Sequence, residues 1–99
     1  MANLFFPNRT PDSGELFETL LTCRNVTVER IVSSAEPEEV EYVQEQDEWV
    51  VILEGSAELE VAGAVRKLAR GESLFLPAKT PHRVLQTAAG TIWLAVHIY

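Results

Sequence analysis

A chain of 99 residues with a formal net charge of −7 is long enough for one compact domain with one hydrophobic core. Hydrophobic residues make up 46% of the chain and charged residues 23%, a balance that excludes an intrinsically disordered protein. No hydrophobic run approaches the ~20 residues of a membrane-spanning helix. The single cysteine, Cys23, excludes an internal disulfide and, since no signal peptide is recognisable, favours the cytoplasm.

The first expected element is a short helix that ends near Cys23. Ser13 precedes an apolar-periodic segment, which is a typical start of a helix. Four apolar residues then fall on one helical face: Leu16, Phe17, Leu20 and Leu21. We therefore expect a single domain in which residues 1–24 form a strand and helix cap on a β-barrel of residues 25–99.

From Asn25 onward, apolar residues recur with a period of two, and glycine and proline interrupt the runs. The expected strands are 26–32, 48–53, 57–61, 74–76, 82–87 and 91–99. No second amphipathic helix separates these runs, which excludes a parallel βαβ sheet. Many short strands at close spacing predict an all-β antiparallel sandwich or barrel.

Acidic residues crowd segment 36–48, which contains no Lys or Arg. Such a surface repels phosphate groups, so we expect neither nucleic acid nor a membrane as a partner. Except for Glu48, we interpret this segment as a solvated edge that resists aggregation.

Two expected strands, 49–53 and 92–98, are apolar on both faces and need cover on both. The interior covers one face, and either the N-terminal segment or a second subunit covers the other. We expect a homodimer, with Trp49 and Trp93 as contact residues. The alternative is that the N-terminal segment provides all of the cover.

The last strand leaves the place of His97 open. One face carries Ile92, Leu94, Val96 and Ile98, and the other carries Trp93, Ala95, His97 and Tyr99. We expect the aliphatic face to fill the barrel, which places His97 at a surface or an interface. If the aromatic face is inside, His97 joins His82.

Two spaced motifs carry the most information about function. Glu48 opens a strongly β-forming run that stops at Gly55. Gly71 begins a second strand, Pro77 ends it, and His82 follows five residues later. This spacing places a carboxylate and an imidazole at the starts of two strands that face each other across a small barrel.

In this order and spacing, residues 42–99 resemble a small single-domain cupin, a double-stranded β-helix of the jelly-roll type. The first motif of that family has two histidines before its glutamate, and Tyr42 and Gln44 stand at those positions here. In the second motif, Lys79 replaces a turn glycine and Gln86 replaces a frequent asparagine.

The resemblance implies a weak site for Zn, Fe, Mn or Ni formed by Gln44, Glu48 and His82. Gln46 and Gln86 are expected to line the same pocket. Glu48 has a structural alternative, an ion pair with a residue such as Arg83. The structural alternative for His82 is a hydrogen bond to a backbone carbonyl.

The resemblance further implies that the barrel binds a small polar molecule. If the protein is an enzyme, an isomerase or a dioxygenase acting on a small organic acid, sugar or enediol fits the site. Glu48 would serve as ligand or base, His82 as ligand or proton donor, and Tyr42 and Gln44 would orient the substrate. The alternatives are a metal-free sensor of a small molecule and a structural dimerising module.

Overall fold

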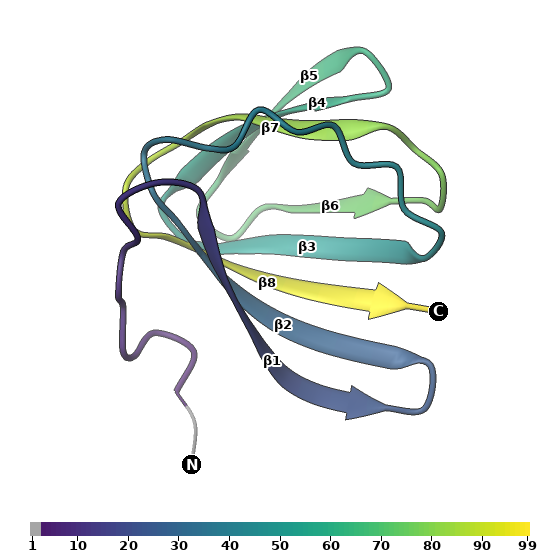
Figure 1. Cartoon of the computed structure of the whole chain (residues 1–99), viewed down its shortest axis with the longest axis horizontal. Helices are drawn as coiled ribbons and strands as arrows, with labels where there is room; N and C mark the ends of the chain where they lie inside the picture. The colour runs from purple at the N-terminus through teal and green to yellow at the C-terminus, as the bar shows by residue number, and fades with distance from the viewer. Residues whose placement is uncertain (1–2) are drawn as a thin grey trace.

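A computed structural model describes residues 3–99, which form eight strands and no helix. The strands are β1 (Glu15–Cys23), β2 (Val26–Ser33), β3 (Asp47–Glu54), β4 (Ser56–Val61), β5 (Ala64–Ala69), β6 (Ser73–Leu76), β7 (His82–Thr87) and β8 (Thr91–Ile98). Five of them form an antiparallel sheet in the order β1-β2-β8-β3-β6, and three form a second in the order β5-β4-β7. Figure 1 shows the two sheets facing each other, which confirms the predicted double-stranded β-helix.

The predicted helix before Cys23 is wrong, because this segment is strand β1 and pairs with β2. Cys23 lies opposite Val26, so a two-residue turn joins the strands, with Arg24 at a φ of 53°. A β-bulge between Thr19 and Leu21 interrupts the period of two in β1. The bulge is why the leucines of β1 follow a helix-like spacing.

Among residues 3–99, no helix could span a membrane.

The hydrophobic core lies between the two sheets. It consists of Ile31, Val50, Ile52, Ala57, Leu59, Leu68, Trp93 and Ala95. The expectation that the aliphatic face of β8 fills the barrel is therefore wrong. Trp93 lies inside, 3% exposed, because its indole N–H donates a hydrogen bond of 2.9 Å to Ser33 Oγ and so can be buried without loss. Trp93 is consequently not available as a contact residue on the surface.

The N-terminal segment crosses part of the outer face of the five-stranded sheet. Arg30 is buried there, and its guanidinium donates hydrogen bonds to the carbonyl oxygens of Leu4 and Pro7. The paired residues Val32 and Ile92 are buried on this same face. The N-terminal segment thus covers part of the outer apolar face that the sequence predicted to be buried.

Two connections fix the strand ends that carry the motifs. Gly55 joins β3 to β4 at a φ of 90°, and a Cβ at this position would lie 2.3 Å from Thr91 Oγ1. Lys79, which replaces the turn glycine of the family, has a φ of 62° and donates its N–H to Gln44 O at 2.6 Å. This bond holds segment 42–44 against the turn that leads into β7.

Candidate functional site

A cavity of about 70 Å³ opens between the two sheets. Its volume accommodates a few water molecules or one end of a small ligand. Its polar lining consists of Glu15, Glu29, Tyr42, Gln44, Glu48, His82 and His97. The cavity therefore brings together Tyr42, Gln44, Glu48 and His82, the four residues to which the sequence assigned catalysis or metal binding.

Glu48 points inward from β3 and is 6% exposed. Its carboxylate faces two imidazoles: Oε1 lies 4.0 Å from His82 Nε2, and Oε2 lies 3.7 Å from His97 Nε2. Burial raises the pKa of Glu48, and the two imidazoles only partly counteract this effect. A carboxyl group with a raised pKa holds a proton more readily than an exposed carboxyl group does, which suits it to exchange a proton with a ligand.

His82 enters the cavity at the start of β7. Its Nδ1 lies 3.0 Å from Thr80 O and donates a hydrogen bond to it, which leaves Nε2 as an acceptor that faces Glu48. Tyr42 stacks on the imidazole with a ring-centroid distance of 5.7 Å, and the backbones of the two residues exchange two hydrogen bonds. The backbone bond considered as a structural alternative is thus present, and it orients Nε2 into the cavity.

His97 also faces the cavity, contrary to its expected place at a surface or an interface. Its Nδ1 accepts a hydrogen bond of 3.1 Å from the Gln46 amide, and its Nε2 donates one of 2.8 Å to Glu29 Oε1. Gln46, expected to line the pocket, instead lies behind His97 and holds it. Sequence reasoning missed Glu29, although its alternation with the core residue Ile31 places both on one face of β2.

Glu15 is a further carboxyl group that the sequence analysis did not select, because it fell in the expected helix. It lines the cavity from β1, and Ser33 Oγ donates a hydrogen bond of 2.5 Å to its Oε2. Burial raises the pKa of Glu15, and the nearby carboxylates of Glu38, Glu48 and Glu29 raise it further.

Gln86, expected to line this cavity, is exposed and lies outside it. Glu58 pairs with Gln86 but Leu59 pairs with Val84, so Leu85 is an extra residue in β7. This bulge turns Gln86 to the outer face of the three-stranded sheet.

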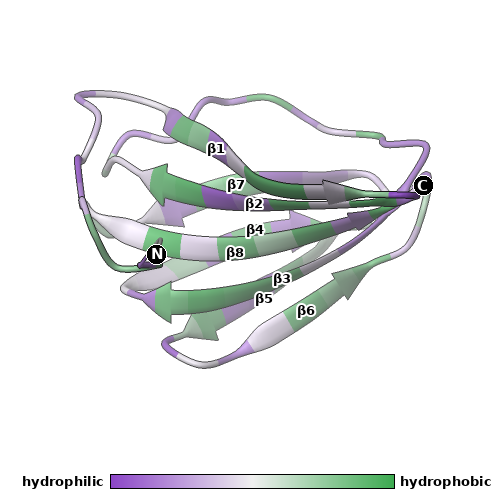
Figure 2. Cartoon of the chain, turned by 90° about the horizontal axis from the view of Figure 1, so that it is seen from below, coloured by the Kyte–Doolittle hydropathy of each residue, from purple (hydrophilic) through white to green (hydrophobic). Residues whose placement is uncertain are grey.

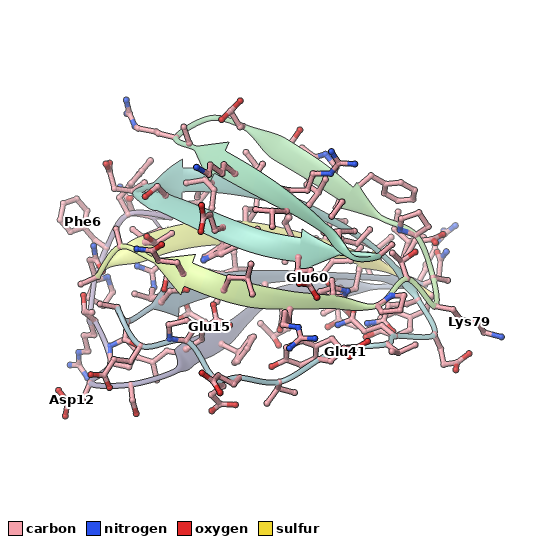
Figure 3. The ribbon with its side chains drawn as sticks, turned by 90° about the horizontal axis from the view of Figure 1, so that it is seen from above. Phe6, Asp12, Glu15, Glu41, Glu60 and Lys79 are labelled. Carbon is pink, nitrogen blue, oxygen red and sulfur yellow. The ribbon has the colours of Figure 1, made fainter. Side chains whose placement is uncertain are left out.

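The alternative of an ion pair between Glu48 and Arg83 is not seen. Arg83 instead contacts Glu60 at 3.3 Å and Glu41 at 3.9 Å. Figure 3 labels Glu60 on the three-stranded sheet and Glu15 on the opposite sheet.

The donor atoms of the cavity do not fit a tightly held metal ion. Within residues 3–99, no group of three or more His, Cys, Asp or Glu side chains could hold one. Gln44, Glu48 and His82 supply only one carboxylate, one imidazole and one amide. His97 adds no free nitrogen, because its Nε2 already donates to Glu29.

Residues 31–97 match the family model of the cupin domain. The chain therefore belongs to the cupin family. A comparison with curated proteins gives no significant match.

Solved structures share the fold over nearly the whole chain. A candidate mannose-6-phosphate isomerase of Ralstonia eutropha JMP134 is 39% identical, with a TM-score of 0.88 over 99% of this chain and 96% of that one. An RmlC-like cupin of Desulfovibrio desulfuricans is 26% identical, with a TM-score of 0.84 over 99% and 94%. A protein of Thermus thermophilus, 20% identical with a TM-score of 0.85 over 99% and 95%, shows the fold alone.

Proposed function

We propose that this cupin binds a small polar molecule in the cavity and that Glu48 and His82 act on it as an acid–base pair. The observation that carries the proposal is the pairing of Glu48 Oε1 and His82 Nε2, 4.0 Å apart on side chains that are each 8% exposed. Neither atom is closed off by a shorter ion pair, so a ligand group on the cavity side can contact both.

Isomerisation through an enediol is the chemistry that this pair supports best. One group removes a proton from a carbon next to a carbonyl, and the other returns a proton to the neighbouring position. The raised pKa of Glu48 suits it to both steps. Tyr42 and Gln44 would orient the substrate. The 39% identity to a candidate sugar-phosphate isomerase supports this reaction class over a dioxygenase.

Proton exchange from small hydroxy-carbonyl compounds in D2O, followed by NMR, tests this activity. We expect deuterium to enter glyceraldehyde or dihydroxyacetone faster with the protein than without it. Glu48→Gln should lower the rate by roughly 10²-fold or more. The matched control is Gln86→Ala, which lies outside the cavity and should leave the rate unchanged. Equal exchange with and without protein would leave only the binding role.

A weakly held divalent ion, Zn, Fe, Mn or Ni on Gln44, Glu48 and His82, is the second candidate. It is supported by the free His82 Nε2 that faces Glu48. Elemental analysis after expression in metal-replete medium should then give about one equivalent, which Glu48→Ala or His82→Ala removes. A metal-free protein whose melting point rises with a small acid, sugar or phenol, without turnover, would instead be a sensor.

We also propose a homodimer formed through the outer face of the five-stranded sheet. Beyond the N-terminal segment, this face exposes several large apolar side chains: Leu21, Trp49, Phe75 and Ile98. Figure 2 shows hydrophobic stretches along β3 and β6, which carry Trp49 and Phe75. An apolar patch of this kind on a soluble domain marks an interaction surface.

Light scattering after gel filtration tests the dimer. Phe75→Glu should give a monomer, because it places a charge in the interface. The control Val65→Glu alters a side chain that is equally exposed, 55% against 52%, but on the three-stranded sheet. A monomeric wild-type protein would contradict the proposal.

The acidic surface and single cysteine support a cytoplasmic protein that binds neither nucleic acid nor membranes.

A further inference from the structure

The polar groups around the cavity are mainly hydrogen-bond acceptors. Three carboxyl groups enter it from three strands: Glu15 from β1, Glu29 from β2 and Glu48 from β3. Within the described part of the chain, no Lys or Arg lines the cavity. Apart from the carboxyl groups, the donors are the Gln44 amide, the Tyr42 hydroxyl, the Trp93 indole N–H and the His97 Nε2–H, and the last two are already bonded to Ser33 and Glu29.

His82 separately indicates that the ligand is a hydrogen-bond donor. Its side chain is 8% exposed, and its Nε2 makes no hydrogen bond within residues 3–99. Because Nδ1 donates to Thr80 O, the neutral ring presents a lone pair at Nε2 toward the cavity. A ring nitrogen whose lone pair faces the cavity can accept a hydrogen bond from a ligand that donates one.

The apolar lining is partly aromatic. Phe17, Tyr42 and Trp93 border the cavity beside the carboxyl groups. Aromatic faces attract organic cations, and carboxylates both attract them and accept their N–H groups. This combination of groups differs from a phosphate site, which requires Arg, Lys or backbone N–H donors.

We propose that the group bound in this cavity is an organic ammonium and that phosphorylated or carboxylated compounds are rejected. This inference rests on the proposed function, whose ligand class it narrows. A phosphate would meet the carboxyl groups of Glu15, Glu29 and Glu48 with no cation to offset them. Despite the 39% identity to a candidate mannose-6-phosphate isomerase, the cavity therefore does not take the phosphate of a sugar phosphate.

The acceptors of the cavity suit an ammonium better than a bare metal ion. An ammonium group donates hydrogen bonds to separate acceptors at about 2.7–3.2 Å in several directions. A transition metal requires three or four donors that converge within about 2.0–2.3 Å of one point. Within residues 3–99, no group of three or more His, Cys, Asp or Glu side chains offers that convergence.

Calorimetric titration with three two-carbon compounds of similar size tests the charge preference. Ethanolamine carries a positive charge, ethylene glycol none and glycolate a negative charge. Wild-type protein should bind ethanolamine saturably and at least about tenfold more tightly than the other two. Mn²⁺ and Zn²⁺ are titrated in parallel, so that binding of a metal ion is distinguished from binding of an ammonium.

Glu15→Gln should weaken ethanolamine binding on the order of tenfold. Its amide oxygen can still accept the hydrogen bond from Ser33 Oγ, so the fold is expected to persist. Glu39→Gln, an exposed residue outside the cavity lining, changes the net charge equally and should have no effect.

The other possible results of these titrations contradict different parts of the proposal. Glycolate or ethylene glycol binding as tightly as ethanolamine contradicts the ammonium and leaves the small-molecule site intact. Metal ions binding while ethanolamine does not also contradicts it, and favours the metal-assisted reading. Equal weakening by Glu15→Gln and Glu39→Gln places the cation outside the cavity. If neither these compounds nor neutral sugars bind, the proposed function fails as well.

Discussion

The two ends of the barrel interior differ in the side chains that they bury: one end buries polar side chains and the other apolar ones. Along β3, Glu48 faces the cavity, whereas Ile52 is fully buried in the core. Along β8, His97 faces the cavity, whereas Ala95 lies in the core, and Trp93 lies where core and cavity meet, with its N–H bonded to Ser33. One strand therefore passes from a polar end to an apolar end within a few residues.

This difference separates residues that stabilise the fold from residues that serve a ligand. Burying an apolar side chain lowers the free energy of the folded state, whereas burying a carboxyl group raises it by the cost of desolvation. A protein retains such carboxyl groups where binding or chemistry needs them. The polar end is accordingly the functional end, and substitutions at the two ends should act in opposite ways.

The largest effect should come from Ile52→Ala at the apolar end. Ile52 is 0% exposed, and its truncation leaves a cavity in the core. We expect a loss of roughly 2–5 kcal/mol in the free energy of unfolding, measured by urea denaturation. The control Val65→Ala removes methyl groups from an exposed side chain and should change it by less than about 0.5 kcal/mol. Similar losses in both variants would contradict the position of the core.

Trp93→Phe should have a smaller effect at the same end. It removes the 2.9 Å hydrogen bond to Ser33 Oγ and some packed volume while keeping an aromatic ring. We expect a loss of about 1–3 kcal/mol in the same urea experiment. An unchanged midpoint would show that the indole N–H contributes nothing to stability.

Glu15→Gln at the polar end should change how stability depends on pH. The pKa of Glu15 is raised above its ordinary value of 4.5, so the folded protein binds this proton more tightly than the unfolded chain does. Its contribution to stability is complete below pH 4.5 and is lost as pH rises through the folded-state pKa. The variant lacks this loss, so its stability relative to wild type should increase as the pH rises above 4.5. A difference that stays constant with pH, or falls, contradicts the burial of this carboxyl group.

The sequence predicts the parts of this molecule that depend on local pattern. Alternating apolar residues and glycine or proline breaks locate most strands, and the spacing of Glu48, Gly55, Gly71, Pro77 and His82 indicates the cupin barrel. The same alternation places Glu48 on the inner face of β3, because Val50 and Ile52 share that face.

The misplaced residues depend on long-range pairing that no local pattern reveals. Bulges in β1 and β7 shift the register of these strands. The bulge in β1 gave its apolar residues a helix-like spacing, so the segment was predicted as a helix, and the bulge in β7 turned Gln86 outward. The inward face of β8 carries Trp93, whose indole N–H is satisfied by Ser33, 60 residues away in the sequence. Glu29 and Glu15 joined the site only because β1 and β2 extend the same sheet.

The urea-induced unfolding of Glu48→Gln near neutral pH tests the central claim most directly. Because Glu48 is a buried carboxyl group whose pKa is raised, a neutral amide of the same shape should leave the free energy of unfolding unchanged or increase it. A loss as large as that of Ile52→Ala would contradict the account, since it would make Glu48 a structural residue of the core.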